Sequence, residues 1–92
     1  MILVFDVGNT NTVIGVYDGE KLLNHWRIRT NAQRTGDEYG ILLRSLLEND
    51  KLNIKDIKSV VVSSVVPTLM MELEWMSRKF FACRPLVIGP GV

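Results

Sequence analysis

The sequence predicts an α/β protein whose elements follow one another as β-β-β-α-β-α-β. Its first thirty positions consist of apolar or β-branched runs separated by short polar turns. After residue 35 the apolar residues recur at helical spacing, and two such segments then alternate with short apolar runs. We therefore expect a three-stranded antiparallel meander that continues by right-handed crossovers into parallel strands, in one domain covering residues 1–92.

Three strands are expected before the first helix. Residues 2–7 (ILVFDV) are apolar apart from Asp6, which is typical of a strand covered on both faces. Residues 12–17 (TVIGVY) predict its antiparallel partner, and Asp18-Gly19 predicts a two-residue turn into a third strand over residues 21–30. Alternation predicts two faces for this edge strand, with Leu22, Asn24, Trp26 and Ile28 on one and Leu23, His25, Arg27 and Arg29 on the wetter other.

Two helices and two strands complete the chain. Thr35 to Glu38 has the form of a capping box, and the helix that it opens should end near residues 49–51. Residues 58–66 predict a buried strand, Pro67 begins a second helix, and residues 85–88 form a last short strand. The buried stripe of the second helix should comprise Leu69, Leu73, Met76 and Phe80. This order is that of a ribonuclease H-like domain, as found in half of an actin-like or hexokinase-like molecule.

Composition excludes several classes of function. The chain has eleven basic and ten acidic residues. Its net charge of +1 does not indicate a basic surface that would bind nucleic acid. The single cysteine, Cys83, excludes an internal disulfide and a cysteine zinc cluster, and we expect it to be a semi-buried small apolar residue. No signal peptide and no apolar stretch of about 20 residues is present, so we expect a cytoplasmic protein without a membrane partner.

The turn between the first two strands is the strongest candidate site. Asp6 closes an apolar strand, and four small polar positions, Gly8 to Asn11, follow Val7. Glycine and asparagine tolerate positive φ, so such a turn can gather N–H groups into a nest for phosphate, with Thr10 adding a hydroxyl donor. Asp6 repels phosphate but can hold a hydrated Mg²⁺ that neutralises it. The alternative is a plain turn in which these side chains cap backbone groups.

Asp6-Val7-Gly8-Asn9-Thr10-Asn11 resembles the first phosphate motif of the type III pantothenate kinases. The resemblance extends to Thr35-x-Asp37-Glu38, to the segment SSVVP at residues 63–67 and to Gly89-Pro90-Gly91. This family belongs to the superfamily of acetate kinases, sugar kinases, heat-shock ATPases and actin. The resemblance implies a cytoplasmic homodimeric transferase that phosphorylates pantothenate with ATP in coenzyme A biosynthesis, using Mg²⁺ and a monovalent cation, K⁺ or NH₄⁺.

The resemblance also implies roles for individual residues. The ATP phosphates would be lined by Asp6, Val7, Gly8, Asn9, Thr10, Asn11, Thr12 and Val13, with Asp6 nearest the metal. Gly91 would lie at the edge of the pantothenate pocket. Ser63 and Ser64, at the end of a strand next to the expected cleft, are expected either to contact substrate or to satisfy backbone groups. The family's aspartate base belongs to a Gly-Ala-Asp-Arg motif that would lie beyond Val92, so we expect an N-terminal kinase fragment that is inactive alone.

Three other functions are compatible with the sequence. A ribonuclease H-like nuclease would need several carboxylates around two metals, of which Asp6 and Glu38 are the candidates. A non-catalytic regulator is a second alternative, because the family resembles Bvg accessory factor. A stand-alone nucleotide-binding module is the third, and it predicts ATP binding by these residues alone.

Overall fold

The computed structural model describes residues 1–89 and has the predicted element order. The elements are β1 (Ile2–Val7), β2 (Asn11–Asp18), β3 (Lys21–Arg29), α1 (Gly36–Asn49), the 3₁₀ turn η1 (Ile54–Asp56), β4 (Ser59–Ser64), α2 (Pro67–Phe81) and β5 (Leu86–Ile88). The turn η1 is not predicted by the sequence pattern. The fourth strand is shorter than expected, because the chain leaves the sheet after Ser64 and Val66 becomes the residue that precedes α2.

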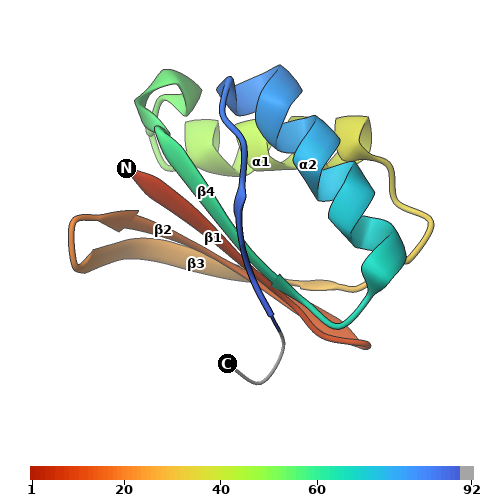
Figure 1. Ribbon diagram of the computed structural model, residues 1–92. Coiled ribbons are helices and arrows are strands. Elements are labelled where there is room, and N and C mark those ends of the chain that lie inside the picture. The colour runs from red at the N-terminus through yellow and green to blue at the C-terminus, as the bar shows by residue number, and fades with distance from the viewer. Residues whose placement is uncertain (90–92) are drawn as a thin grey trace.

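The five strands form one mixed sheet in the order β3-β2-β1-β4-β5. The first three strands are antiparallel neighbours, whereas β4 runs parallel to β1 and β5 parallel to β4. Strand β3 lies at one edge, as predicted. Figure 1 shows α1 and α2 side by side on the same face of this sheet.

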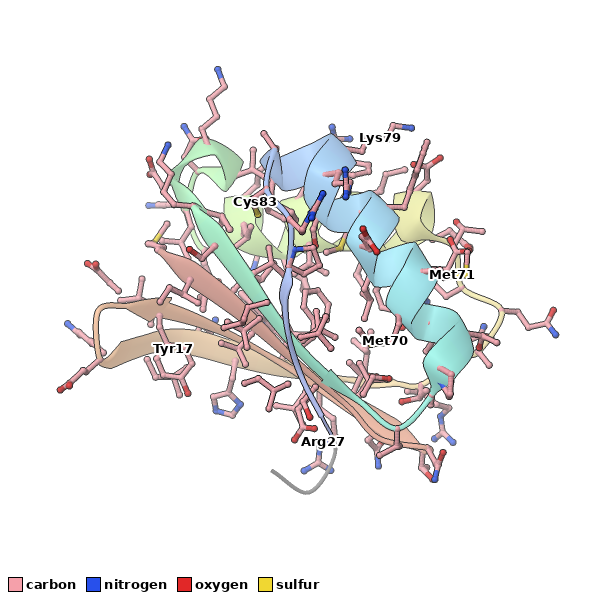
Figure 2. All side chains as sticks on the ribbon, viewed as in Figure 1. Tyr17, Arg27, Met70, Met71, Lys79 and Cys83 are labelled. Atoms are coloured by element: carbon pink, nitrogen blue, oxygen red, sulfur yellow. The ribbon has the colours of Figure 1, made fainter. Side chains whose placement is uncertain are left out.

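Within residues 1–89, only the face of the sheet that carries the helices is covered. Leu3, Phe5 and Val7 of β1 are buried beneath the helices, whereas Val4 is half-buried and Asp6 is exposed on the opposite, open face. The expectation that β1 is covered on both faces is therefore wrong for residues 1–89. In Figure 2 the side chains of Tyr17 and Arg27 extend from the open face, away from the helices.

The β2–β3 hairpin differs from its prediction in two details. Asp18 pairs with Lys21, so the linking residues are Gly19 and Glu20, and Gly19 takes the positive φ of 61° that a type II′ turn requires at its first position. The register then shifts between Val16 and Tyr17. This β-bulge places Leu22 opposite Tyr17 on the open face, not on the face of Asn24 and Trp26.

Local chemistry explains the limits of α1. Thr35 Oγ1 accepts a hydrogen bond from the backbone N–H of Glu38, and the Glu38 carboxylate accepts one from the N–H of Thr35, so the predicted capping box is confirmed. The helix ends at Asn49, within the expected range. Tyr39, Leu43 and Leu47 form its buried face.

Helix α2 begins at Pro67 as predicted and buries Leu69, Leu73 and Met76 fully. At its C-terminal end the stripe differs from the prediction: Phe80 is only half-buried, and Phe81 is buried in its place. The reason is that α2 packs on α1 as well as on the sheet, so that Phe80 lies against Gly40 of α1. No helix within residues 1–89 is both long and apolar enough to cross a membrane.

Cys83 follows α2 and is half-buried against the core, as predicted. Burial raises the pKa of its thiol above the ordinary value.

Candidate functional site

The loop between β1 and β2 lies at the carboxyl end of β1, beside the carboxyl end of β4. The parallel register pairs Asp6 with Ser63 and Val7 with Ser64, and the N–H of Val65 donates to the Val7 carbonyl over 3.0 Å. The structure thus brings together two of the predicted site segments, the loop after β1 and the end of β4. In open α/β sheets, ligand sites commonly form at the carboxyl ends of parallel strands.

The loop is closed by an internal hydrogen bond, from the Gly8 N–H to the Asn11 carbonyl over 2.9 Å. Gly8 does not use positive φ: within residues 1–89 only Gly19, Lys51 and Ala82 do. The expected nest built on a left-handed residue is therefore absent from this loop. Close approach is the property of Gly8 that the loop uses: a Cβ there would lie 3.1 Å from the Asn11 carbonyl oxygen, so a larger residue would push the loop apart by a few tenths of an ångström.

The polar side chains at the tip of the loop remain available to a ligand. Asn9, Thr10 and Asn11 are exposed, and none of their side chains has a hydrogen-bond partner within residues 1–89. They supply two amide groups and one hydroxyl as donors. Such donors are of the kind that hydrogen-bond an anion, and no described residue accepts from the N–H groups of Asn9 and Thr10.

The strand alternation divides the predicted stretch from Asp6 to Val13 between the two faces. Val7 and Thr12 are buried on the helix-bearing face, so their side chains cannot contact a ligand on the open side. Asp6 and Val13 are cross-strand partners on the open face, where Val13 is 40% exposed. Of the eight predicted residues, Asp6 and those at the loop tip present polar side chains to solvent.

Asp6 has a chemical environment that fits a hydrated divalent cation. It is exposed, and no ion pair of the described residues engages it. No group of three histidine, cysteine or acidic side chains that could hold a metal occurs among the described residues. A single carboxylate suits Mg²⁺, which keeps most of its water and takes further oxygens from phosphate.

Asp6 also lines a groove of about 370 Å³ on the open face. Strands β1, β2 and β3 contribute its walls, which consist of Val4, Asp6, Val13, Gly15, Tyr17, Leu22 and His25. His25 is exposed on this face, as predicted for the wetter side of β3.

The two serines at the end of β4 have different roles. The Ser64 hydroxyl accepts from the Val66 N–H over 2.9 Å and lies 3.1 Å from the Val66 carbonyl, so it satisfies the backbone of the turn into α2. Ser63 lies on the open face beside Asp6 and is half-buried. Gly91, the third residue expected at a substrate pocket, lies outside the described residues.

Sequence reasoning missed Thr30, which lies directly behind the loop. Its hydroxyl donates to the Gly8 carbonyl over 2.8 Å, and its N–H donates to the Thr10 carbonyl over 2.8 Å. Thr12 Oγ1 lies 2.8 Å from Thr30 Oγ1. No local pattern could have indicated these contacts, because Thr30 is 22 residues from Gly8 in the sequence.

Two further polar groups are buried near Thr12. The Tyr39 hydroxyl and Arg34 Nη1 are inaccessible and have no hydrogen-bond partner among the described residues, and the Arg34 guanidinium lies 5.4 Å from the centre of the Tyr39 ring. Burial raises the pKa of Tyr39, and the nearby Arg34 charge opposes that shift.

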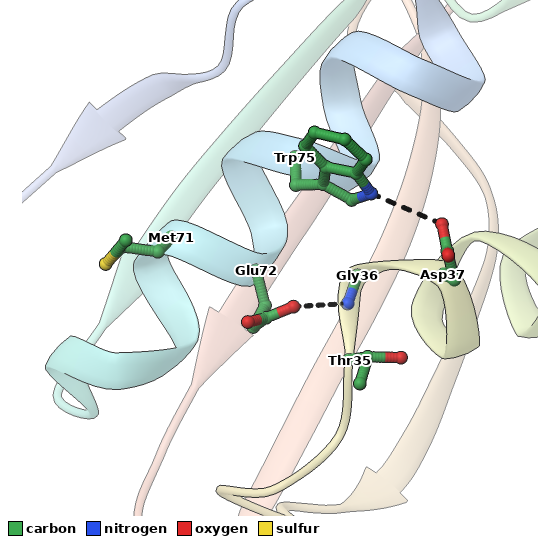
Figure 3. Close-up of a pocket in the computed structure, with 6 residues that line it drawn as sticks. All are labelled: Thr35, Gly36, Asp37, Met71, Glu72 and Trp75. Atoms are coloured by element: carbon green, nitrogen blue, oxygen red, sulfur yellow. Dashed lines mark hydrogen bonds between the residues drawn. The ribbon is translucent and has the colours of Figure 1, made fainter.

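A second groove, of about 380 Å³, lies between the start of α1 and the middle of α2 (Figure 3). The Glu72 carboxylate accepts from the Gly36 N–H over 2.7 Å, and Asp37 accepts from Trp75 Nε1 over 3.3 Å. Hydrogen bonds from Lys79 and then Trp75 lower the pKa of Asp37. This groove is formed by the two helices and includes no residue of the loop after β1.

The nuclease alternative is not supported by this geometry. The Glu38 carboxylate is engaged in the cap of α1, where backbone and side-chain hydrogen bonds to Thr35 lower its pKa. It therefore does not join Asp6 in a two-metal site, and the described residues contain no other such cluster.

Comparison with known proteins gives concordant results. The profile of the family described as "Type III pantothenate kinase" matches residues 2–92. Curated proteins of that name from Geobacillus kaustophilus, Bacillus cytotoxicus and Myxococcus xanthus are 52%, 53% and 54% identical over all 92 residues. The chain spans only 35–36% of the length of these relatives.

Solved structures match at the level of the fold. A structural genomics target from Porphyromonas gingivalis superimposes with a TM-score of 0.66 at 21% identity, over 97% of this chain and 34% of that one. The ROK hexokinase of Thermus thermophilus gives a TM-score of 0.64 at 13% identity, over 96% of this chain and 34% of that one. The predicted ribonuclease H-like, actin-like architecture is thereby confirmed.

Proposed function

Because the chain belongs to the type III pantothenate kinase family, we propose that the protein transfers phosphate from ATP to pantothenate, the first step of coenzyme A biosynthesis. Residues 1–92 would be the N-terminal, ATP-phosphate-binding part of this enzyme. The observation that supports this role best is the position of an exposed carboxylate, Asp6, beside a loop whose exposed polar side chains are unpartnered within residues 1–89.

The loop would hold the phosphates, and Asp6 would orient the metal. Asn9, Thr10 and Asn11 would donate hydrogen bonds to phosphate oxygens, and Asp6 would accept hydrogen bonds from water bound to Mg²⁺. Bound Mg²⁺ neutralises charge on the phosphates during transfer. Val7 and Thr12, whose side chains are buried, would contribute through the main chain only, and Val13 through apolar contact.

The remaining parts of the proposed function are the substrate site, the second cation and the assembly. We propose Ser63, which lies next to Asp6 on the open face, and Gly91 for the edge of the pantothenate pocket. The base that accepts the substrate's hydroxyl proton is assigned to an aspartate outside these 92 residues. We propose a monovalent cation, K⁺ or NH₄⁺, and a cytoplasmic homodimer without nucleic-acid or membrane partners.

Kinase activity is favoured over a purely regulatory role, because the relatives at 51–55% identity carry the kinase name. Turnover separates the two roles experimentally. The full-length protein should phosphorylate pantothenate with MgATP, as measured by formation of ADP and of the phosphorylated product. Absence of turnover would instead support the regulatory role, whereas ATP binding by residues 1–92 alone would support the stand-alone nucleotide-binding module.

The role of Asp6 has its own test. Asp6→Asn should lower kcat by about a hundredfold or more through lost metal positioning, with the fold intact. The matched control is Asp18→Asn, which changes an exposed aspartate at the far end of β2 and should leave kcat unchanged. A normal kcat for Asp6→Asn would remove Asp6 from the mechanism.

A further inference from the structure

Thr30 donates hydrogen bonds to both ends of the loop that follows β1. The side-chain hydroxyl donates to the carbonyl of Gly8, where the loop leaves β1, and the backbone N–H donates to the carbonyl of Thr10, just before β2 begins. Both distances are 2.8 Å. The loop itself contains a single internal backbone hydrogen bond, from Gly8 to Asn11. Among residues 1–89, Thr30 therefore contributes two of the three hydrogen bonds that define the shape of residues 8–10.

The direction of the hydroxyl hydrogen bonds follows from a count of protons. Thr30 has one hydroxyl proton, and it donates this proton in the hydrogen bond to the Gly8 carbonyl, because a carbonyl oxygen can only accept. The hydroxyl of Thr12, 2.8 Å away and fully buried, must then donate to Thr30. The two threonines thus form an ordered chain of donors from the core to the loop.

We infer that Thr30 is a positioning residue for nucleotide binding, which acts by holding the Gly8–Asn11 loop in the shape that presents Asn9 and Thr10 to phosphate. This inference rests on the proposed function, since it assumes that the loop binds the phosphates of ATP. Loss of the hydroxyl would leave the Gly8 carbonyl without its partner and release one side of the loop. Thr30 itself need not touch the ligand.

The test uses three variants of the full-length protein. Thr30→Val removes the hydroxyl but keeps the side-chain shape and the N–H bond to Thr10. Thr30→Ser restores the hydroxyl and should recover binding. Thr12→Val removes only the donor behind Thr30, which can still donate to Gly8, so its effect should be smaller than that of Thr30→Val.

Two readouts are measured on each variant. The Kd for a non-hydrolysable ATP analogue with Mg²⁺, from calorimetry, should rise about tenfold or more in Thr30→Val. The KM for ATP should rise in parallel, whereas the KM for pantothenate should stay within about twofold. A loss of stability alone would not separate the two KM values in this way. Ile57→Val, a buried change beside the opposite end of β4, controls for general destabilisation.

The outcomes distinguish this inference from the proposed function. If the wild-type protein binds the analogue but does not phosphorylate pantothenate, and Thr30→Val weakens binding, the inference stands and the proposed function fails. If Thr30→Val binds the analogue with wild-type affinity, the inference is overturned whatever the turnover. It is also overturned if Ile57→Val weakens binding as much as Thr30→Val, or if Thr30→Ser restores nothing.

Discussion

At the scale of single residues, Gly40 sets how closely the two helices approach. A Cβ at this position would lie 2.2–2.5 Å from ring atoms of Phe80, which is closer than atoms in contact can lie. Gly40→Ala should therefore lower the free energy of unfolding of the full-length protein by about 1–3 kcal/mol, because the helices must separate or the ring must turn. Denaturant unfolding measures the change.

The matched control is Ser45→Ala, at an exposed position of the same helix. There the higher helix propensity of alanine should raise stability by a few tenths of a kcal/mol. A Gly40→Ala variant that is stabilised to a similar extent would contradict the close contact. Adding Phe80→Leu to Gly40→Ala should recover part of the loss, because the two substitutions concern the same contact and are not additive.

Single residues also show where sequence reasoning reaches its limit. Asp6 could be singled out because a carboxylate interrupts an apolar strand directly before a polar turn. Thr30 and Gly40 could not, because their partners lie 22 and 40 residues away in the chain and only the fold brings them together. Of the two properties expected of Gly8, close backbone approach is present, towards the Asn11 carbonyl, whereas positive φ is not.

At the scale of elements, the start of α1 should make stability depend on pH. Hydrogen bonds from Thr35 lower the pKa of Glu38 below its ordinary value of 4.5. A carboxyl group whose pKa is lowered by folding stabilises the folded protein at pH values above its ordinary pKa. This stabilisation is lost as the pH falls through the lowered pKa. The midpoint of thermal unfolding should therefore decrease as the pH falls below about 4.5.

Glu38→Gln tests this cause. Glutamine can still close the capping box but carries no titratable group, so the decrease in Tm at acidic pH should be smaller than in the wild type. Glu48→Gln, at an exposed position in the last turn of α1, is the control and should keep the wild-type pH profile. The same acid dependence in Glu38→Gln as in the wild type would exclude Glu38 as its source.

Elements were predictable wherever their limits depend on neighbouring residues. The capping box and Pro67 fix the starts of α1 and α2 by local hydrogen bonding and ring geometry, and both starts were predicted. The bulge at Val16/Tyr17 and the early end of β4 depend on strand partners elsewhere in the chain, so the alternation of the sequence could not indicate them.

At the scale of the whole molecule, the parallel pairing of β1 with β4 creates the candidate site. It places Asp6 beside Ser63 and the loop after β1 beside the turn before α2, although some 57 residues separate these partners. The sequence predicted the loop from its polar residues and predicted that Ser63 and Ser64 end a strand next to the expected cleft. The division of residues 6–13 between two faces follows from the strand register, which reveals which side chains can face a ligand.

Because helices cover only one face of the sheet within residues 1–89, the 92-residue chain should behave in a specific way when it is studied alone. Leu86, Val87 and Ile88 of the edge strand β5 are 64%, 55% and 38% exposed, and Val13 and Leu22 are exposed on the open face. An uncovered edge strand pairs readily with another chain, and apolar surface next to it strengthens the association. The isolated chain should therefore self-associate at tens of micromolar, as measured by sedimentation velocity.

The edge strand can be tested separately from other exposed apolar residues. Leu86→Lys places a charge on β5 and should shift the sedimentation profile towards monomer, because a charged edge resists pairing. Met71→Lys changes a side chain that is 77% exposed on α2, outside the sheet, and should leave self-association unchanged. A sharp monomer for the unmodified chain would contradict the prediction, whereas equal effects of the two substitutions would assign the association to apolar surface in general rather than to strand pairing.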